Sequence, residues 1–399
     1  MKSVVKLLAV MLTMVLICQC EKDEPIPIVT ISDDTFLSAL IELGIDTDGD
    51  GKISYAEAEV VISLDVSGDS ISDMAGIDKF VNLETLICNH NQLTALDITN
   101  NTALDTLMCY DNQLTILDAS NNINLKYLKC GWNRNLKSLD VSNCTALIYL
   151  NCYEDQLTTL DVSNNINLEY LSCSYNQISN LDVSNNTALS FLNCGDNQLT
   201  TLDVSNNTEL LNLDCRNWGL PHNQITSLDV SNNTALKSLK CDYNLLTTLD
   251  VSNNINLEVL GCGSNQLTAL DVSNNTTLIY LDCQLNQLSS LDVSNNTALI
   301  YLICWINQLT SLDVSNQPDL KILIGGGNQL TSLDLSNNSS IGQDLGYNAG
   351  WFNCYLDIRN MPSLEEVCVW MMPFPPEGFK LCLDGSPNVF FTTDCSIVR

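Results

Sequence analysis

The stretch FLNCGDNQLTTLDVSNNTEL, from Phe191 to Leu210, recurs in near-identical copies through most of the 399-residue chain. Every copy but the last has a cysteine in its first half, and every copy has an aspartate in its second half. Self-similarity at a short fixed period indicates a repeat architecture, in which each unit packs only on its neighbours. Twelve units, most of them 21 residues long, begin at Leu83, Leu104, Leu125, Leu147, Leu168, Leu189, Leu210, Leu236, Leu257, Leu278, Leu299 and Leu320.

The consensus unit, LxxLxCxxNQLTxLDVSNNTA, has the alternation of apolar and exposed residues that is typical of β-strands. This two-residue period occurs in LxC and again in LDV, and no segment of the unit has a helical period. One unit alone cannot bury its leucines, whereas stacked units can. We therefore expect a mainly β solenoid with two parallel sheets, one from each half of the unit, and almost no helix.

The unit resembles the leucine-rich repeat, whose signature LxxLxLxxN occurs here twice per unit, as LxxLxCxxN and LTxLDVSNN. The match covers about two-thirds of the chain. The resemblance implies a leucine-rich-repeat solenoid over residues 63–340. A short helix-loop-helix over 32–62 is expected to cap its first edge, and a degenerate repeat with a C-terminal cap is expected over 341–399.

Eleven cysteines occupy the same position of successive units. A compact buried thiol packs as a small apolar side chain, and this is the interpretation we favour. Zinc ligands must converge on one point, and disulfides need side chains that face each other, whereas this spacing predicts a line of parallel thiols. The eleven are Cys88, Cys109, Cys130, Cys152, Cys173, Cys194, Cys215, Cys241, Cys262, Cys283 and Cys304.

Four later cysteines, Cys354, Cys368, Cys382 and Cys395, lie outside this register. The tail that contains them resembles the capping end of similar surface repeat proteins. Those proteins often carry one cysteine after the last strand and one near the end. The resemblance implies a Cys368–Cys395 disulfide, which an exported protein can keep.

Twelve aspartates lie between two inward-facing residues of the second half-unit and are expected to point outward. Neighbouring carboxylates at strand spacing repel each other by roughly 1–3 kcal/mol. Hydrogen bonds from nearby Ser and Thr residues would offset this repulsion, and a row of cation sites is the alternative. The aspartates are Asp97, Asp118, Asp140, Asp161, Asp182, Asp203, Asp229, Asp250, Asp271, Asp292, Asp313 and Asp334.

The exposed positions of the cysteine-bearing half vary between units and are rich in aromatic residues. Side chains of this kind are enriched at recognition surfaces, which predicts a binding face on this strand. The alternative is that tyrosine is present only because it favours strands. Trp218, in a five-residue insertion, is expected to mark a local protrusion. The predicted binding residues are Tyr110, Tyr127, Trp132, Tyr149, Tyr153, Tyr170, Tyr175, Phe191, Tyr243, Tyr280, Tyr301 and Trp305.

Residues 46–57, DTDGDGKISYAE, match the EF-hand calcium loop at every ligand position, with Gly51 at the sharp turn. Calcium prefers hard oxygen ligands, and helical flanks are plausible on both sides, with Ser32 or Asp33 as the first N-cap. A single loop favours a permanently filled structural calcium site over a switch. The predicted ligands are Asp46, Asp48, Asp50, Lys52, Ser54 and Glu57.

The N-terminus predicts export. Lys2 and Lys6 precede an apolar run over 7–17, which has the length of a signal-peptide core. Residues 1–19 are the predicted signal peptide, and Cys20 is the predicted lipidated residue at the head of an acidic linker over 20–31. The EKDE after Cys20 resembles the surface-export tag of Bacteroidetes lipoproteins. An ordinary cleaved signal with a secreted product is the alternative.

The charge and the motifs of the chain limit the classes of function that we expect. The chain has 16 Lys and Arg residues against 47 Asp and Glu residues, which argues against a nucleic-acid partner. It has two histidines and neither a nucleophile motif nor a phosphate loop, so we expect no enzyme. The sequence therefore predicts a monomeric surface or outer-membrane adhesion protein that contacts the membrane only through a lipid. The expected partner is an extracellular protein, with a glycan or no specific ligand as the alternatives.

Overall fold

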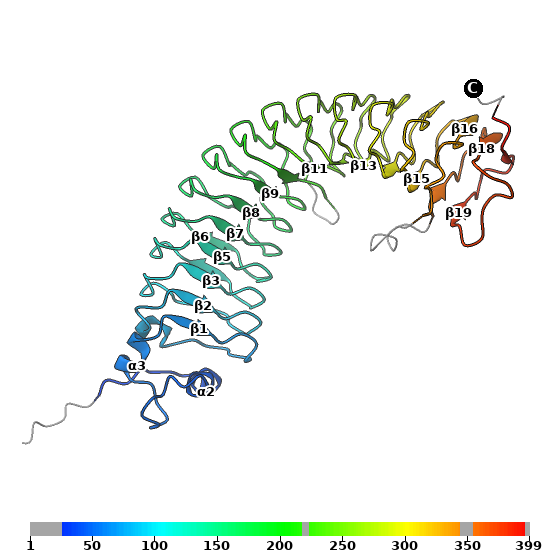
Figure 1. Cartoon of the computed structure of the whole chain (residues 1–399). Coiled ribbons are helices and arrows are strands. Elements are labelled where there is room, and N and C mark those ends of the chain that lie inside the picture. Colours follow the sequence, from blue (N-terminus) through cyan, green and yellow to red (C-terminus); the bar gives the residue numbers. More distant parts are fainter. Residues whose placement is uncertain (1–25, 218–222, 344–353, 396–399) are drawn as a thin grey trace, which may run out of the picture.

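The computed structural model describes residues 26–217, 223–343 and 354–395, which form a curved solenoid (Figure 1). A 15-stranded sheet follows the inner, concave side of the arc, and every strand pair is parallel and in register. The prediction of a mainly β solenoid is confirmed. Trp218, Cys20 and the predicted signal peptide lie outside the described residues.

Each strand of the concave sheet is two or three residues long and places its central leucine against that of the next unit, as Leu192 does with Leu213. The strands are β1 (Ser63–Asp65), β2 (Thr85–Ile87), β3 (Thr106–Met108), β5 (Tyr127–Lys129), β7 (Tyr149–Asn151), β8 (Tyr170–Ser172), β9 (Phe191–Asn193), β10 (Asn212–Asp214), β11 (Ser238–Lys240), β12 (Val259–Gly261), β13 (Tyr280–Asp282), β14 (Tyr301–Ile303), β15 (Ile322–Ile324), β17 (Leu356–Asp357) and β19 (Leu381–Cys382).

The expected second sheet is present only in pieces, so that part of the prediction was wrong. In the described residues, the LDV half forms a pair, β4 (Ile116–Asp118) with β6 (Ser138–Asp140), and contributes one strand to a three-stranded piece whose other two strands come from the C-terminal cap. That piece consists of β16 (Ser332–Asp334), β18 (Glu366–Cys368) and β20 (Phe390–Thr392). The arc explains the difference, because its outer side is spaced more widely than its inner side, and a β ladder needs strands about 4.8 Å apart.

Two helices and a 3₁₀ turn cover the first edge of the solenoid. Helix α2 (Asp34–Glu42) begins after Asp33, whose carboxylate accepts hydrogen bonds from the first-turn amides. Helix α3 (Tyr55–Glu59) begins with a capping box between Ser54 and Glu57. The turn η1 (Ile77–Lys79) precedes the first full repeat. The predicted helical flanks of the 46–57 loop are therefore present, with Asp33 as the N-cap.

The leucines and the eleven ladder cysteines fill the space between the two sides of the solenoid, where the thiols are fully buried and unpaired. Burial raises the pKa of these thiols, to about 12 at Cys173, because a thiolate is poorly solvated in an apolar interior. The thiols therefore remain protonated and act as packing groups, as the sequence predicts. In the C-terminal cap, Cys368 is joined to Cys395 and Cys354 to Cys382.

A first amide ladder ties every coil to the one before it. The Asn197 side chain, for example, donates to the carbonyls of Cys194 and Cys173 and accepts from the amide of Ile178. These bonds satisfy buried backbone groups that an irregular corner would leave unpaired. The same pattern is made by Asn91, Asn112, Asn133, Asn176, Asn197, Asn223, Asn244, Asn265, Asn286, Asn307 and Asn328.

A second amide ladder lies at the other corner of the coil. Asn186, for example, donates to the carbonyls of Val162 and Asn165 in the preceding unit. Where the sequence departs from asparagine, another donor takes its place. The Cys144 thiol donates to the Ala119 carbonyl, and the Gln317 amide donates to the preceding unit.

Within the described residues, Asp155 is the one substitution for a first-ladder asparagine that lacks an amide group to donate. One of its carboxylate oxygens accepts from the amide of Asn133, while the other is buried with no partner among the described residues. Burial raises the pKa of Asp155 to about 8. In an unfolded chain the carboxyl ionises near pH 3.9, so the folded state holds an extra proton between these two values.

We predict that Asp155→Asn stabilises the protein at pH 7, because it restores the amide donor and removes a buried carboxyl. The expected gain in the free energy of unfolding is about 1–3 kcal/mol. In the parent protein, the stability contribution of Asp155 is complete below about pH 4 and is lost as the pH rises towards 8. Thermal unfolding measured across this range should therefore show a larger fall in the parent than in the variant, which keeps the other buried carboxyls.

Asn176→Asp is the matched control, because it places the same defect in the next unit and should lower the melting temperature at pH 7. An Asp155→Asn protein that melts no higher than the parent at pH 7 would contradict the assignment.

Candidate binding surface and calcium loop

Six of the predicted binding residues form one row on the concave sheet, at the first position of their strands. Four of them are consecutive and in contact. The ring centroids of Tyr149 and Tyr170 are 4.3 Å apart, and those of Tyr170 and Phe191 are 4.4 Å apart, with nearly parallel planes. Tyr127 lies at the end of this stack and is 45% exposed. The row consists of Tyr127, Tyr149, Tyr170, Phe191, Tyr280 and Tyr301.

The other six predicted residues lie beyond the strands, on the turn that follows each ladder cysteine. Tyr110, Tyr153 and Trp305 come directly after the cysteine. Trp132, Tyr175 and Tyr243 come one residue later. The sequence pattern assigned all twelve to strands, so the predicted surface is in fact a strand row bordered by a turn row.

Residues at the later turn position have a left-handed backbone. Ten non-glycine residues there, Trp132 and Tyr175 among them, have φ between 49° and 61°. Their amides continue the hydrogen-bonded ladder past the strand, as Tyr175 does by donating to the carbonyl of Gly195. The conformation is costly for a side chain-bearing residue, by about 1–2 kcal/mol. The ladder and the asparagine that follows hold it in place.

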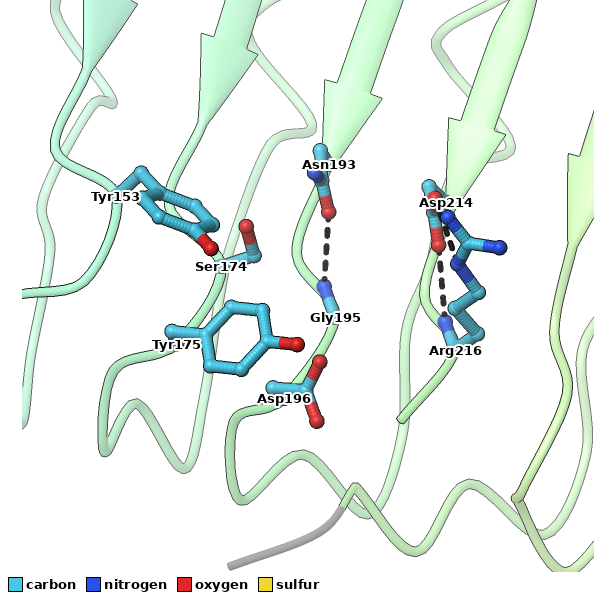
Figure 2. A pocket seen from close by; sticks show the side chains of 8 residues that line it. All are labelled: Tyr153, Ser174, Tyr175, Asn193, Gly195, Asp196, Asp214 and Arg216. Carbon is cyan, nitrogen blue, oxygen red and sulfur yellow. Dashed lines mark hydrogen bonds and ion pairs between the residues drawn. The ribbon is translucent and has the colours of Figure 1, made fainter. Parts of the chain in front are cut away.

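A recess of about 450 Å³ opens between the fourth and seventh units (Figure 2). It lies where two successive units have small residues, Ser174 and Gly195, at the position directly after the cysteine. The units on either side have Tyr153 and Arg216 there. The full lining is Tyr153, Ser174, Tyr175, Asn193, Gly195, Asp196, Asp214 and Arg216.

The recess has both signs of charge. The Arg216 Nε lies 3.1 Å from a carboxylate oxygen of Asp214, and burial raises the pKa of Asp214 in spite of that partner. Burial, assisted by the negative charge of Asp196, raises the pKa of Tyr175 to about 12. The sequence analysis identified Tyr153 and Tyr175 but missed the polar lining. The signal in the sequence that could have revealed the recess is the small residue, Ser174 or Gly195, directly after the cysteine in two successive units.

Further along the concave face, two carboxyls flank a strip without side chains at Gly261 and Gly263. Asp242 accepts the amide of Gly263, and Asp282 contacts Tyr280 and Gln284. Burial raises the pKa of both Asp242 and Asp282, and the negative charge of Asp242 raises that of Asp282 further. This part of the face is therefore less negative near neutral pH than its composition suggests.

The twelve outward aspartates each accept a hydrogen bond from the backbone amide two residues ahead. Asp203, for example, accepts from the amide of Ser205 at 2.9 Å. The Ser205 hydroxyl contributes most to lowering the pKa of Asp203. The predicted Ser and Thr partners are thus in place, and each carboxylate closes a turn at the outer side of its unit.

The predicted calcium loop brings together three of its ligands. Carboxylate oxygens of Asp46, Asp48 and Asp50 all lie within 4.8 Å of one another. Asp46 also accepts the amides of Gly49 and Gly51, so the loop is curled around this carboxylate. Three hard oxygen ligands at one point fit the chemistry of Ca²⁺.

The sixth predicted ligand, Glu57, stands slightly apart from this cluster. One oxygen accepts from the amide and hydroxyl of Thr47, and the other from the amide and hydroxyl of Ser54. These bonds lower the pKa of Glu57 to about 2, and the bond from the Ser54 amide contributes most. Ser54 serves as the helix cap, and Lys52, whose backbone carbonyl is the predicted ligand, donates its amide to Asp50.

The loop is paired with an extended segment instead of a second loop. Ile28 and Ser54 form an antiparallel bridge, with the amide of Val29 donating to Ile53 and that of Tyr55 donating to Pro27. Ile53 is fully buried in the same apolar core as the repeats. The single loop is therefore integrated into the solenoid cap.

Comparison with solved structures relates this architecture to known proteins. The functional domain of InlJ from Listeria monocytogenes, which includes a cysteine ladder, is 31% identical, with a TM-score of 0.57. The match covers 84% of this chain and 80% of that domain. This chain is an internalin-like leucine-rich-repeat protein. Its own line of buried cysteines, from Cys88 to Cys304, is a feature of the same kind.

Two further comparisons concern this internalin-like protein. An internalin, InlF, from Listeria monocytogenes has the same fold, at 20% identity and a TM-score of 0.61, over 93% of this chain and 98% of that one. Internalin J of the same species is 37% identical over 70 residues, which are 18% of this chain and only 8% of that curated protein. No family model matches. In the described ranges, no helix of the internalin-like protein is long and apolar enough to span a bilayer.

Proposed function

We propose that this protein is an exported, surface-exposed binding protein that recognises an extracellular protein through its concave sheet. The resemblance to internalins supports this class of function. The observation that carries it is the contrast between the two sides of the repeat. The outer side repeats Asp, followed two residues later by Ser or Thr, in every unit, whereas the concave side varies and holds the aromatic stack of Tyr149, Tyr170 and Phe191.

The aromatic stack has the properties of an interface centre. Its rings are half-buried against each other, so their conformations are restricted before a partner arrives. Aromatic side chains that are ordered in advance lose little entropy on binding and dominate many protein interfaces. The proposal includes attachment to the membrane through Cys20 and activity as a binder instead of an enzyme. A spacer without a ligand would have no need for the variation on one side.

We predict that Tyr149→Ala/Tyr170→Ala/Phe191→Ala abolishes capture of the extracellular partner. Truncation at an interface centre costs more than about 2 kcal/mol per residue. The measurement is a pull-down from a surface-protein extract with the purified protein, followed by direct binding of the captured component.

Thr159→Ala/Asn180→Ala/Thr201→Ala is the matched control, because it changes exposed residues on the outer side of the same three units. Equal capture by both triple variants would refute the assignment of the concave face. An equal loss of capture in the two triple variants would also refute this assignment.

We also propose that Ca²⁺ is a structural ligand of the 46–57 loop. Asp46, Asp48 and Asp50 would hold the ion, with Glu57 at the end of the loop. Bound calcium supplies positive charge that offsets the repulsion among the aspartates. The capping helices would then be fixed against the first repeats.

We predict that EDTA lowers the melting temperature of the parent protein and that added Ca²⁺ restores it. Asp46→Ala should melt at the lower temperature with or without EDTA. Ca²⁺ stabilises the folded protein only by binding to it, and this variant lacks a ligand for the ion. Asp319→Ala, at an exposed carboxylate outside the loop, should respond to EDTA as the parent does. A parent protein with the same melting temperature in EDTA and in millimolar Ca²⁺ would rule the proposal out.

A further inference from the structure

The recess described above owes its shape to two units. Tyr153 and Arg216 occupy the same repeat position three coils apart, which is roughly 14 Å at strand spacing. Ser174 and Gly195 fill the two positions between them and leave the floor low. The volume of about 450 Å³ lies within the range of roughly 300–1,000 Å³ that is typical of small-ligand sites.

Gly195 is required at the floor by its neighbour. A Cβ on this residue would approach the backbone oxygen of Arg216 closer than any real contact allows. The amide of Asp196 donates to that same oxygen at 3.0 Å. The low floor is therefore part of the backbone hydrogen-bonding pattern and is maintained without a ligand.

The polar groups that line the recess are held in place before binding. The side-chain oxygen of Asn193 accepts the amide of Gly195, and the carboxylate of Asp214 accepts the amide of Arg216 while pairing with its guanidinium. The rings of Tyr153 and Tyr175 meet edge to face with centroids 5.2 Å apart. Figure 2 shows these groups arranged around one opening.

One hydroxyl in the recess has no partner. Ser174 is 2% exposed, and its Oγ makes no hydrogen bond within the described part of the chain. A buried hydroxyl without a partner costs about 1–3 kcal/mol. A ligand that both donates and accepts would satisfy it, and this points to a polar occupant independently of the shape.

The charges of the recess exclude most occupants. An anion would meet Asp196 and Asp214 in a protein of net charge −31, and a cation would meet the guanidinium of Arg216. An apolar side chain would exclude water from the polar lining without replacing the hydrogen bonds that water makes there. A neutral group remains, one with several hydroxyls on its edge and an apolar face that can lie on a tyrosine ring.

We propose that the recess binds a neutral hexose unit of a saccharide. The tyrosine rings would cover the C–H face of the sugar, while Asn193, Arg216, Asp214 and the Ser174 hydroxyl would pair with neighbouring sugar hydroxyls, each of which donates and accepts. This site is separate from the aromatic stack, so it is independent of the protein-binding function proposed above. The sugar could belong to a glycoprotein or to a free polysaccharide.

The experiment uses the purified protein on an array of neutral, sialylated and sulfated oligosaccharides, with a set of basic peptides beside them. The strongest neutral oligosaccharide is then titrated by calorimetry, free and conjugated to a carrier protein, which distinguishes the two sources. Ser174→Tyr fills the recess with a side chain that the repeat accepts at this position in Tyr110 and Tyr153. Tyr153→Ala removes one wall. Thr201→Ala, at an exposed residue on the outer side of the sixth unit, is the control.

We expect neutral oligosaccharides to bind, both recess variants to lose at least about tenfold in affinity, and Thr201→Ala to bind as the parent does. Melting temperatures should show that all variants are folded, and Tyr153→Ala provides the test if Ser174→Tyr is not. Binding of acidic glycans alone, binding of basic peptides alone, or no binding would each overturn it. So would neutral binding that the folded recess variants leave unchanged.

Discussion

The architecture depends on one side-chain interaction, the amide of a buried asparagine that donates to the carbonyls of its own coil and of the coil before it. In Asn197 and its equivalents, this bond fixes the corner, sets the distance between units and satisfies backbone groups that have no β partner. The cysteine three residues before most of these asparagines is small enough for the two sides of the coil to approach. Regular ladders in turn hold the exposed residues in rows, and those rows make a surface.

The core of the fold could be predicted from the sequence because every inward position repeats. The leucines, the ladder cysteines and the helical flanks of residues 46–57 all lie where local patterning places them. The extent of the second sheet could not be predicted. It depends on curvature, which is a property of the whole stack, and no single unit encodes it. LDV has strand-like alternation in each unit, yet only β4 with β6 and the C-terminal piece are spaced closely enough to form a ladder.

The candidate binding surface was predictable in part for a related reason. Aromatic residues such as Tyr149 and Tyr170 are visible in the sequence because they interrupt a pattern with a large side chain. The recess is formed by the opposite event, the absence of large side chains at Ser174 and Gly195, and its walls come from units that are 63 residues apart in the chain. The predicted calcium loop, in contrast, is encoded within a dozen residues, and the three aspartates meet as the spacing implies.

The left-handed turn position has a consequence for how such a surface can change. Glycine or asparagine would relax the backbone there, yet the chain retains Trp132, Glu154, Tyr175 and Leu285, among others. Because the fold accepts indole, carboxylate, phenol and aliphatic groups at one unchanging backbone geometry, new specificities can arise there by point substitution alone. Residues at this turn position can therefore change without a change in the backbone that carries them.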